Sequence, residues 1–180
     1  MLTIGRVDYA EAIAPIQAIR RQVFQEEQGV AAELEFDGED ATAIHFLAYQ
    51  GDRAVGTTRI RYFPATSVMI PDFVIAVIAD NTTNTTNTCE TVAKIERVAV
   101  LAECRGQKIG QQLMKEAIAY LNQQRITAIK LNAQLAVQAF YEQLGFHPQG
   151  AVFEEAGIPH VTMWYIPPSP PPLPDCDVAR

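Results

Sequence analysis

Residues 94–114, KIERVAVLAECRGQKIGQQLM, restrict the possible fold of this chain more than any other segment. The segment begins with an apolar run rich in β-branched residues, 95–101, which predicts a buried strand. A short polar turn containing Gly106 and Gly110 follows and opens an amphipathic helix. The first N–H groups of a helix have no partners within it and lie at the positive end of its dipole, so they can bind phosphate oxygens. The segment therefore predicts a phosphorylated ligand.

Two common phosphate-binding loops do not fit this turn. A P-loop requires Lys-Ser/Thr after its last glycine, where this chain has Gln111 and Gln112, and a dinucleotide-binding loop requires Gly-x-Gly-x-x-Gly. The run 105–110, RGQKIG, instead resembles the Arg/Gln-x-x-Gly-x-Gly/Ala signature of the GNAT N-acetyltransferases, whose loop holds the pyrophosphate of acetyl-coenzyme A. Lys108 departs from that pattern, because it stands where the family usually has its middle glycine. The alternative is a strand-to-helix connection that uses glycine only for turning.

The remaining patterns predict a single mixed α/β sheet. The order β-α-β-β-β-α-β-α-β-β differs from a run of βαβ repeats and resembles the GNAT fold, in which helices cover both faces of a mixed central sheet. We expect a GNAT domain over residues 1–166, with a low-complexity insertion at about 64–89 and an extended proline-rich tail at 167–180. The expected strands are 2–7, 44–49, 54–63, 95–101, 127–131, 151–155 and 161–166, and the expected helices are 11–27, 109–124 and 135–144.

Two further groups of residues support the resemblance. The run 139–146, AFYEQLGF, resembles the Phe/Leu-Tyr-x-x-x-Gly-Phe helix end of the family. The runs 21–24 (RQVF) and 27–29 (EQG), together with 154–163 (EEAGIPHVTM), resemble the ElaA-like branch of the GNAT superfamily. The chain is therefore identified as a member of that branch.

Composition and charge narrow the classes of function. A length of 180 residues fits one domain, and a net charge of −7 with a pI near 4.9 argues against general nucleic-acid binding. No apolar stretch is long enough to span a membrane, and the N-terminus lacks a secretory pattern, so we expect a cytoplasmic protein. We also expect it to be a monomer or homodimer. The three cysteines lack metal-ligand spacing, and we expect no metal.

Acetyl transfer from a thioester to an amine requires an uncharged amine, a polarised thioester carbonyl and a proton for the departing thiolate. The resemblance implies that the Val98 N–H receives the developing oxyanion and that Tyr141 is the acid, because a phenol stays protonated near neutral pH. It implies that Glu96 is the base, two residues before Val98 and on the same face of the predicted strand where no bulge intervenes. The alternatives are a packed structural role for Tyr141 and an ion pair of Glu96 with Lys94 or Arg97.

The resemblance also implies two sets of binding residues. Those expected to hold acetyl-coenzyme A are Val98, Ala99, Val100, Arg105, Gly106, Gln107, Lys108, Ile109, Gly110, Gln111 and Asn132. Those expected to line the acceptor site are Glu27, Gln28, Glu155 and His160, the last two being alternative bases.

Two hypotheses of function follow. The first is an acetyl-coenzyme A-dependent N-acetyltransferase that acts by direct attack on a primary amine of a small molecule or peptide. The second is a catalytically silent coenzyme A-binding module that serves as a sensor or interaction protein.

Overall fold

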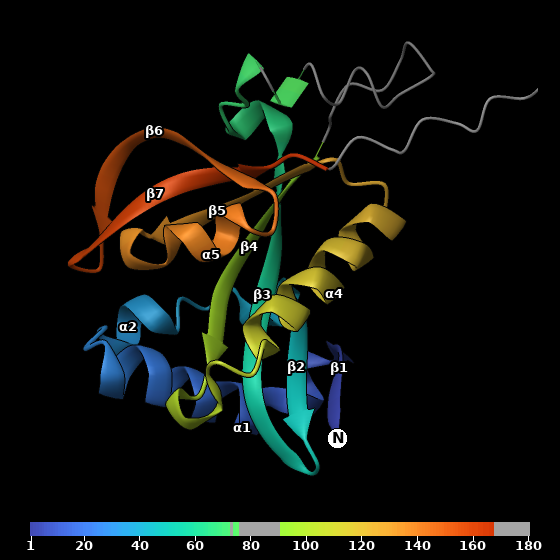
Figure 1. Ribbon diagram of the computed structural model, residues 1–180, viewed down its shortest axis with the longest axis vertical. Helices are drawn as coiled ribbons and strands as arrows, with labels where there is room; N and C mark the ends of the chain where they lie inside the picture. Colours follow the sequence, from blue (N-terminus) through green and yellow to red (C-terminus); the bar gives the residue numbers. More distant parts are fainter. Residues whose placement is uncertain (73, 76–90, 168–180) are drawn as a thin grey trace, which may run out of the picture.

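One seven-stranded mixed sheet organises the molecule (Figure 1). The computed structural model describes residues 1–72, 74, 75 and 91–167. The strand order is β1-β2-β3-β4-β5-β7-β6, and every neighbouring pair is antiparallel except the parallel pair β4 and β5. The strands are β1 Leu2–Val7, β2 Ile44–Gln50, β3 Arg53–Pro64, β4 Thr91–Val100, β5 Ala128–Gln134, β6 Phe146–Glu155 and β7 Ile158–Tyr165. This confirms the predicted mixed α/β sheet.

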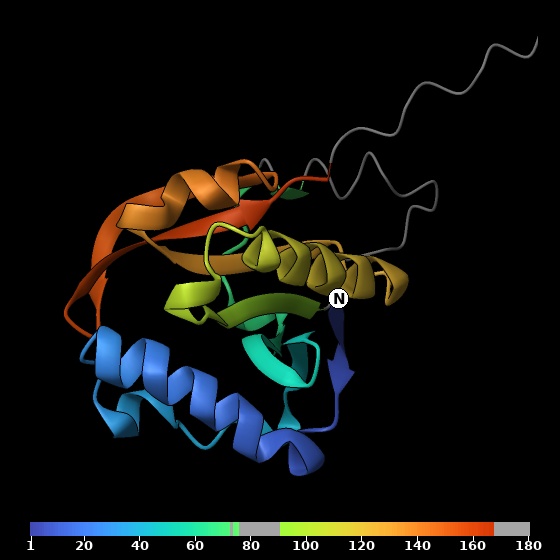
Figure 2. The same ribbon diagram turned by 60° about the horizontal axis from the view of Figure 1, so that its bottom comes forward.

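Helices cover both faces of the sheet (Figure 2). Helix α1, Tyr9–Arg20, packs on one face over β2, β3 and β4, and α4, Ile109–Gln123, packs on the other. Gly56 on β3 lets α4 approach closely, since a Cβ at that position would lie 2.9 Å from Leu113 Cδ1. Helix α5, Gln138–Glu142, covers β5 and β6. The buried apolar faces of these helices and of the sheet form the main core.

The first long helix differs from its prediction. It begins at Tyr9, where the Asp8 carboxylate accepts a hydrogen bond of 2.8 Å from the Ala10 N–H, and it continues after Arg20 as a π-helical segment, Arg21–Glu27. Hydrophobic periodicity alone does not distinguish a π-helical segment from an α-helix. The segment 30–41, expected to be irregular, contains the short helix α2, Ala32–Glu35.

Part of the predicted insertion packs on the sheet. Val68, Ile70 and Val74 lie against a small second core that includes Val92 and Trp164. The Asn-Thr repeat and the proline-rich tail lie outside the described residues. Within the described ranges, no helix is both long enough and apolar enough to cross a bilayer.

Candidate functional site

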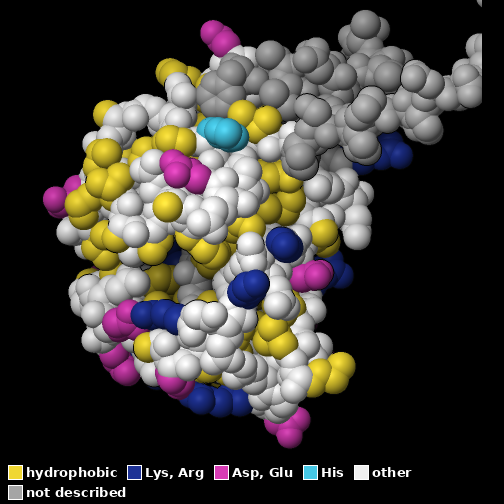
Figure 3. Space-filling view, viewed as in Figure 1, with side chains coloured by type: hydrophobic (Ala, Val, Ile, Leu, Met, Phe, Trp, Pro, Cys, Tyr) yellow, Lys and Arg dark blue, Asp and Glu magenta, His cyan; other side chains and the backbone are white. Residues whose placement is uncertain are grey.

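A cavity of about 970 Å³ lies where β4 and β5 separate. The two strands pair only over Val92–Lys94 and Ala128–Lys130, yet β4 continues to Val100 and β5 to Gln134. Beyond the paired residues, β4 and β5 form no hydrogen-bonded ladder with each other. The backbone groups on their facing edges are therefore available to a ligand. Figure 3 shows the hollow on this face of the molecule, with hydrophobic side chains inside it.

A β-bulge in β4 lies at the cavity. Glu96 pairs with Arg59 of β3 and Ala99 pairs with Thr57. Two residues of β4, 97 and 98, therefore lie opposite the single β3 residue 58. Arg97 has a φ of 54°, in the left-handed region that the first residue of one class of β-bulge adopts. The bulge shifts the alternation of side chains, so Glu96 shares its face with Ala99. The expectation that Glu96 and Val98 lie on one face was made for a strand without a bulge, and it does not apply here, because the extra residue changes the register.

The phosphate turn has the geometry of an anion site. Lys108 caps α4 with a φ of 62°, and no side chain caps the helix. The first helical hydrogen bond runs from the Gln112 N–H to the Lys108 carbonyl, at 3.0 Å. The N–H groups of Ile109, Gly110 and Gln111 therefore have no partner within the helix. Lys108 thus adopts the conformation that glycine adopts most easily, which explains why the family usually has glycine at this position.

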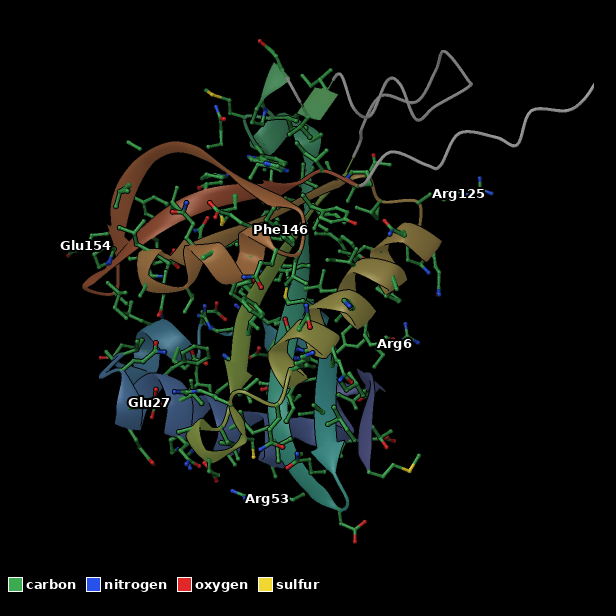
Figure 4. The ribbon with its side chains drawn as sticks, viewed as in Figure 1. Arg6, Glu27, Arg53, Arg125, Phe146 and Glu154 are labelled. Atoms are coloured by element: carbon green, nitrogen blue, oxygen red, sulfur yellow. The ribbon has the colours of Figure 1, made fainter. Side chains whose placement is uncertain are left out.

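The structure brings together two residues that the sequence assigned to different ligands. The two terminal nitrogens of Arg105 donate hydrogen bonds to the Glu27 carboxylate, at 2.6 and 2.7 Å, and its Nε donates to the Val100 carbonyl at 3.0 Å. The hydrogen bond from Arg105 lowers the pKa of Glu27. This ion pair joins the π-helical segment to the phosphate turn, and both residues line the cavity. Glu27 is labelled in Figure 4. By contrast, the Gln107 side chain bonds to Gln50 and lies outside the cavity.

Tyr141 lines the cavity from α5 and is almost completely buried. Its ring packs edge-on against Phe140 and Phe146, with ring centroids 4.9 and 6.1 Å away. Burial raises the pKa of the phenol well above its ordinary value. The hydroxyl is therefore protonated throughout the physiological pH range.

Glu96 also lines the cavity, where cations surround its carboxylate. Its oxygens lie 2.8 Å from Arg59 Nη2 and 3.0 Å from Lys94 Nζ. Burial raises the pKa of Glu96, but the charges of Lys94 and Arg59 outweigh burial and the net pKa is lowered. Because a low pKa means weak basicity, these ion pairs argue against Glu96 as the base. That role of Glu96 stays a prediction.

A buried ionic cluster holds α2 against the sheet. The Arg20 guanidinium bonds to the carboxylates of Glu35 and Asp40, and Asp40 also accepts from Arg59 at 2.9 Å. The Arg97 Nε lies 2.8 Å from Glu35. Sequence reasoning did not identify Glu35 as one of the residues that line the cavity. No pattern in the sequence pointed to this role, because the burial of Arg20 and Arg59, which requires acidic partners, follows only from the complete fold.

The β5–β7–β6 part of the sheet forms a polar wall of the cavity. The register pairs Asn132 of β5 with Thr162 of β7, and it pairs His160 with Gln134 on β5 and with Phe153 on β6. These residues therefore share one face, as does Glu155, two residues after Phe153. The wall thus contains the predicted acceptor residues Glu155 and His160, and it also contains Asn132, predicted for the cofactor.

Hydrogen bonds fix the orientation of two side chains on this wall. Asn132 Nδ2 donates to Glu155 Oε2 at 2.9 Å. His160 Nδ1 lies 2.7 Å from the Ile158 carbonyl, and since a carbonyl only accepts, Nδ1 carries the proton. In neutral His160, Nε2 is therefore the basic nitrogen. Gln28 accepts from Gln134 at 2.8 Å, which connects the wall to the end of the first helix.

No cluster suited to a metal ion occurs in the described portion of the chain.

Comparison with known proteins gives the class to which this fold and site belong. The family model of the GNAT acetyltransferase domain matches residues 71–166, and the chain belongs to this family. It is homologous to ElaA of Escherichia coli, with 41% identity over 70 residues, which cover 38% of this chain and 46% of ElaA. The ElaA crystal structure has a TM-score of 0.69 at 26% identity, covering 92% of this chain and 99% of that one.

Two other proteins extend the comparison over nearly the full length. YyaT of Bacillus subtilis is 30% identical over 165 residues, which cover 90% of this chain and 94% of YyaT. Arabidopsis thaliana NAA60, solved in complex with acetyl-coenzyme A, has a TM-score of 0.68 at 12% identity and covers 92% of this chain and 98% of its own. At that identity NAA60 shares the fold alone.

Proposed function

We propose that this protein transfers the acetyl group of acetyl-coenzyme A to a primary amine by direct attack, within a catalytic domain of residues 1–166. The observation that carries the proposal is the separation of β4 from β5 beside the uncapped start of α4. This geometry offers unpaired strand edges to an amide-containing arm and free N–H groups to a pyrophosphate. The NAA60 complex supports the choice of acetyl-coenzyme A, because the same fold holds that molecule there.

The proposed binding mode uses the predicted cofactor residues. The N–H groups of Ile109, Gly110 and Gln111 receive the pyrophosphate, and the Lys108 ammonium adds a positive charge beside them. The pantetheine arm pairs with the free edge of β4 near Val98. Arg105 contributes by holding the turn to Glu27 and to the Val100 carbonyl.

In the proposed reaction the amine nitrogen attacks the thioester carbonyl carbon, and the C–S bond then breaks. The Val98 N–H, at the bulge where Val98 has no register partner on β3, stabilises the oxyanion of the tetrahedral intermediate. Tyr141 gives its proton to the departing thiolate sulfur, and coenzyme A leaves as a thiol. The proton that the amine loses passes to a base on the acceptor side.

We assign the base to His160 in place of Glu96. The Ile158 carbonyl fixes the tautomer of His160 and leaves Nε2 as the proton acceptor. Among the described residues no group forms a hydrogen bond with that nitrogen. Glu96, in contrast, is held by Arg59 and Lys94, which neutralise its charge.

A thiol-release assay across a panel of primary amines tests this function. The purified protein is mixed with acetyl-coenzyme A and each amine, and free coenzyme A is measured against a blank without amine. We expect amine-dependent release with at least one amine. Binding of acetyl-coenzyme A without amine-dependent release would instead favour the silent coenzyme A-binding module.

A further inference from the structure

A chain of hydrogen bonds crosses three strands on the polar wall of the cavity. Thr162 Oγ1 of β7 donates to Asn132 Oδ1 of β5 at 3.3 Å, and Asn132 Nδ2 donates to Glu155 Oε2 of β6 at 2.9 Å. The direction of the chain follows from chemistry, because an ionised carboxylate only accepts hydrogen bonds. The Asn132 amide must present its NH₂ group to Glu155, which leaves its oxygen for the Thr162 hydroxyl.

Glu155 differs from the other carboxylates of the cavity in its partner. Glu27, Glu35 and Glu96 are each bonded to at least one arginine or lysine. Within the described residues, Glu155 has no cationic partner, and its one hydrogen bond comes from the neutral Asn132 amide. Its negative charge is therefore the one that the protein leaves uncompensated on this cavity wall, where a cationic ligand would compensate it.

We infer that Glu155 holds the cationic form of the acceptor amine and that Asn132 and Thr162 are positioning residues that orient Glu155. The inference rests on the proposed function. It changes the role of Asn132, which the sequence assigned to coenzyme A. His160 lies on the same wall, two positions along β7 from Ile158, the partner of Glu155, and takes the proton once the amine is bound.

The positions 154 and 155 supply a matched pair of variants. Glu154 is exposed, lies outside the cavity, and projects outward at the end of the β6–β7 hairpin (Figure 4). Glu155→Gln and Glu154→Gln remove the same charge from adjacent residues of one strand. Their comparison separates the position of the charge from its contribution to the net charge of the protein.

The test is steady-state kinetics with an amine that the thiol-release panel identifies. Glu155→Gln should raise the KM for the amine by about 10- to 100-fold, because charged hydrogen bonds are lost, and should leave the KM for acetyl-coenzyme A within about twofold. Glu154→Gln should leave both values unchanged. Asn132→Ala should raise the KM for the amine by about 5- to 10-fold, again without affecting acetyl-coenzyme A.

Two substitutions at Thr162 provide a rescue test, because a merely structural role would not distinguish valine from serine at this position. Thr162→Val removes the donor to Asn132 and should raise the KM for the amine by about threefold, whereas Thr162→Ser keeps the hydroxyl and should match the wild type. An increase in the KM for acetyl-coenzyme A alone in Asn132→Ala would overturn the inference and return Asn132 to the cofactor. Equal effects of the substitutions at 154 and 155 would also overturn it. If no amine in the panel is acetylated, the proposed function fails and this inference fails with it.

Discussion

At the scale of single residues, Tyr141 is the most direct link between structure and chemistry. Its hydroxyl lies in the cavity wall, and burial keeps it protonated. Tyr141→Phe removes the hydroxyl and keeps the packing of the ring against Phe140 and Phe146. We expect kcat to fall by about 10²- to 10⁴-fold, the range for losing a proton-transfer group, with the affinity for acetyl-coenzyme A unchanged. A variant with wild-type kcat would show that water protonates the thiolate.

The identity of the base is a second prediction at this scale. Turnover should rise with pH as the base loses its proton, and His160→Gln should remove that ascending limb and lower kcat by about 10²- to 10⁴-fold. Measurement of kcat against pH for the wild type and the variant checks this.

Glu96→Gln is the matched contrast to the His160 variant. It should keep the ascending limb, because Glu96 is an ion-pair partner of Arg59 and Lys94 in this account. Its effect should fall on stability, with a loss of about 2 kcal/mol in the free energy of unfolding, because Arg59 and Lys94 lose a charged hydrogen-bond acceptor while Arg59 keeps Asp37 and Asp40. If Glu96→Gln loses the limb and His160→Gln keeps it, the base is Glu96, as the sequence first indicated.

At the scale of elements, the start of α4 carries the largest predicted effect on binding. A Cβ at Gly110 would lie 3.5 Å from Phe140 Cζ and 3.6 Å from Val100 Cγ2, which are ordinary contact distances, so the fold tolerates a side chain there. Gly110→Asp adds an anion beside the phosphate site. Calorimetric titration should show a loss of affinity for acetyl-coenzyme A of about 100-fold or more, by charge repulsion.

Gly110→Ala is the control, because it adds the Cβ without the charge. Its loss of affinity should be smaller than that of Gly110→Asp, and both variants should keep the wild-type midpoint of thermal unfolding to within a few degrees. Unchanged affinity in Gly110→Asp would mean that phosphate binds elsewhere.

The sequence allowed prediction of the elements better than of their irregularities. The periods of apolar residues located β1, β2, β3 and α4 almost to their observed bounds, because a period of 2.0 or 3.6 residues follows from backbone geometry. The bulge at Arg97 and the π-helical segment after Arg20 were beyond such reasoning, since each depends on tertiary packing that no local pattern encodes. The bulge is what separates the face of Glu96 from that of Val98.

The candidate site was predictable in its residues and less so in their partners. Tyr141, His160 and Glu155 were identified from motifs, and the structure places all of them on the cavity. The bonds of Arg105 to Glu27 and of Asn132 to Glu155 join residues far apart in the chain. Such pairings depend on strand order and register, which a single sequence specifies only through the complete fold.

At the scale of the whole molecule, the buried ionic cluster makes stability depend on pH. Asp37 accepts two hydrogen bonds from Arg59, at 2.6 and 2.7 Å, and these bonds hold the pKa of Asp37 well below its ordinary value. A lowered folded-state pKa contributes stability that is complete above the unfolded-state value of about 3.9 and is lost as pH falls toward the folded-state value. Burial gives Glu35 a raised pKa, so its contribution has the opposite sign.

Asp37→Asn tests this contribution. It should lower the free energy of unfolding by about 2 kcal/mol at pH 7, the loss expected for hydrogen bonds to a charged group, and the difference from the wild type should shrink below about pH 4. Urea denaturation at a series of pH values measures both. A difference that stays constant down to pH 2.5 would show that Asp37 contributes by shape and packing.

The central claim is that the separated strands and the start of α4 hold acetyl-coenzyme A with its thioester beside Tyr141. The most direct test is a crystal structure of the protein with acetyl-coenzyme A. This account predicts pyrophosphate oxygens within about 3.2 Å of the N–H nitrogens of Ile109, Gly110 or Gln111, and the thioester sulfur within about 4 Å of Tyr141 Oη. A complex with the pyrophosphate away from the start of α4, or with the sulfur beyond the reach of Tyr141, would contradict it.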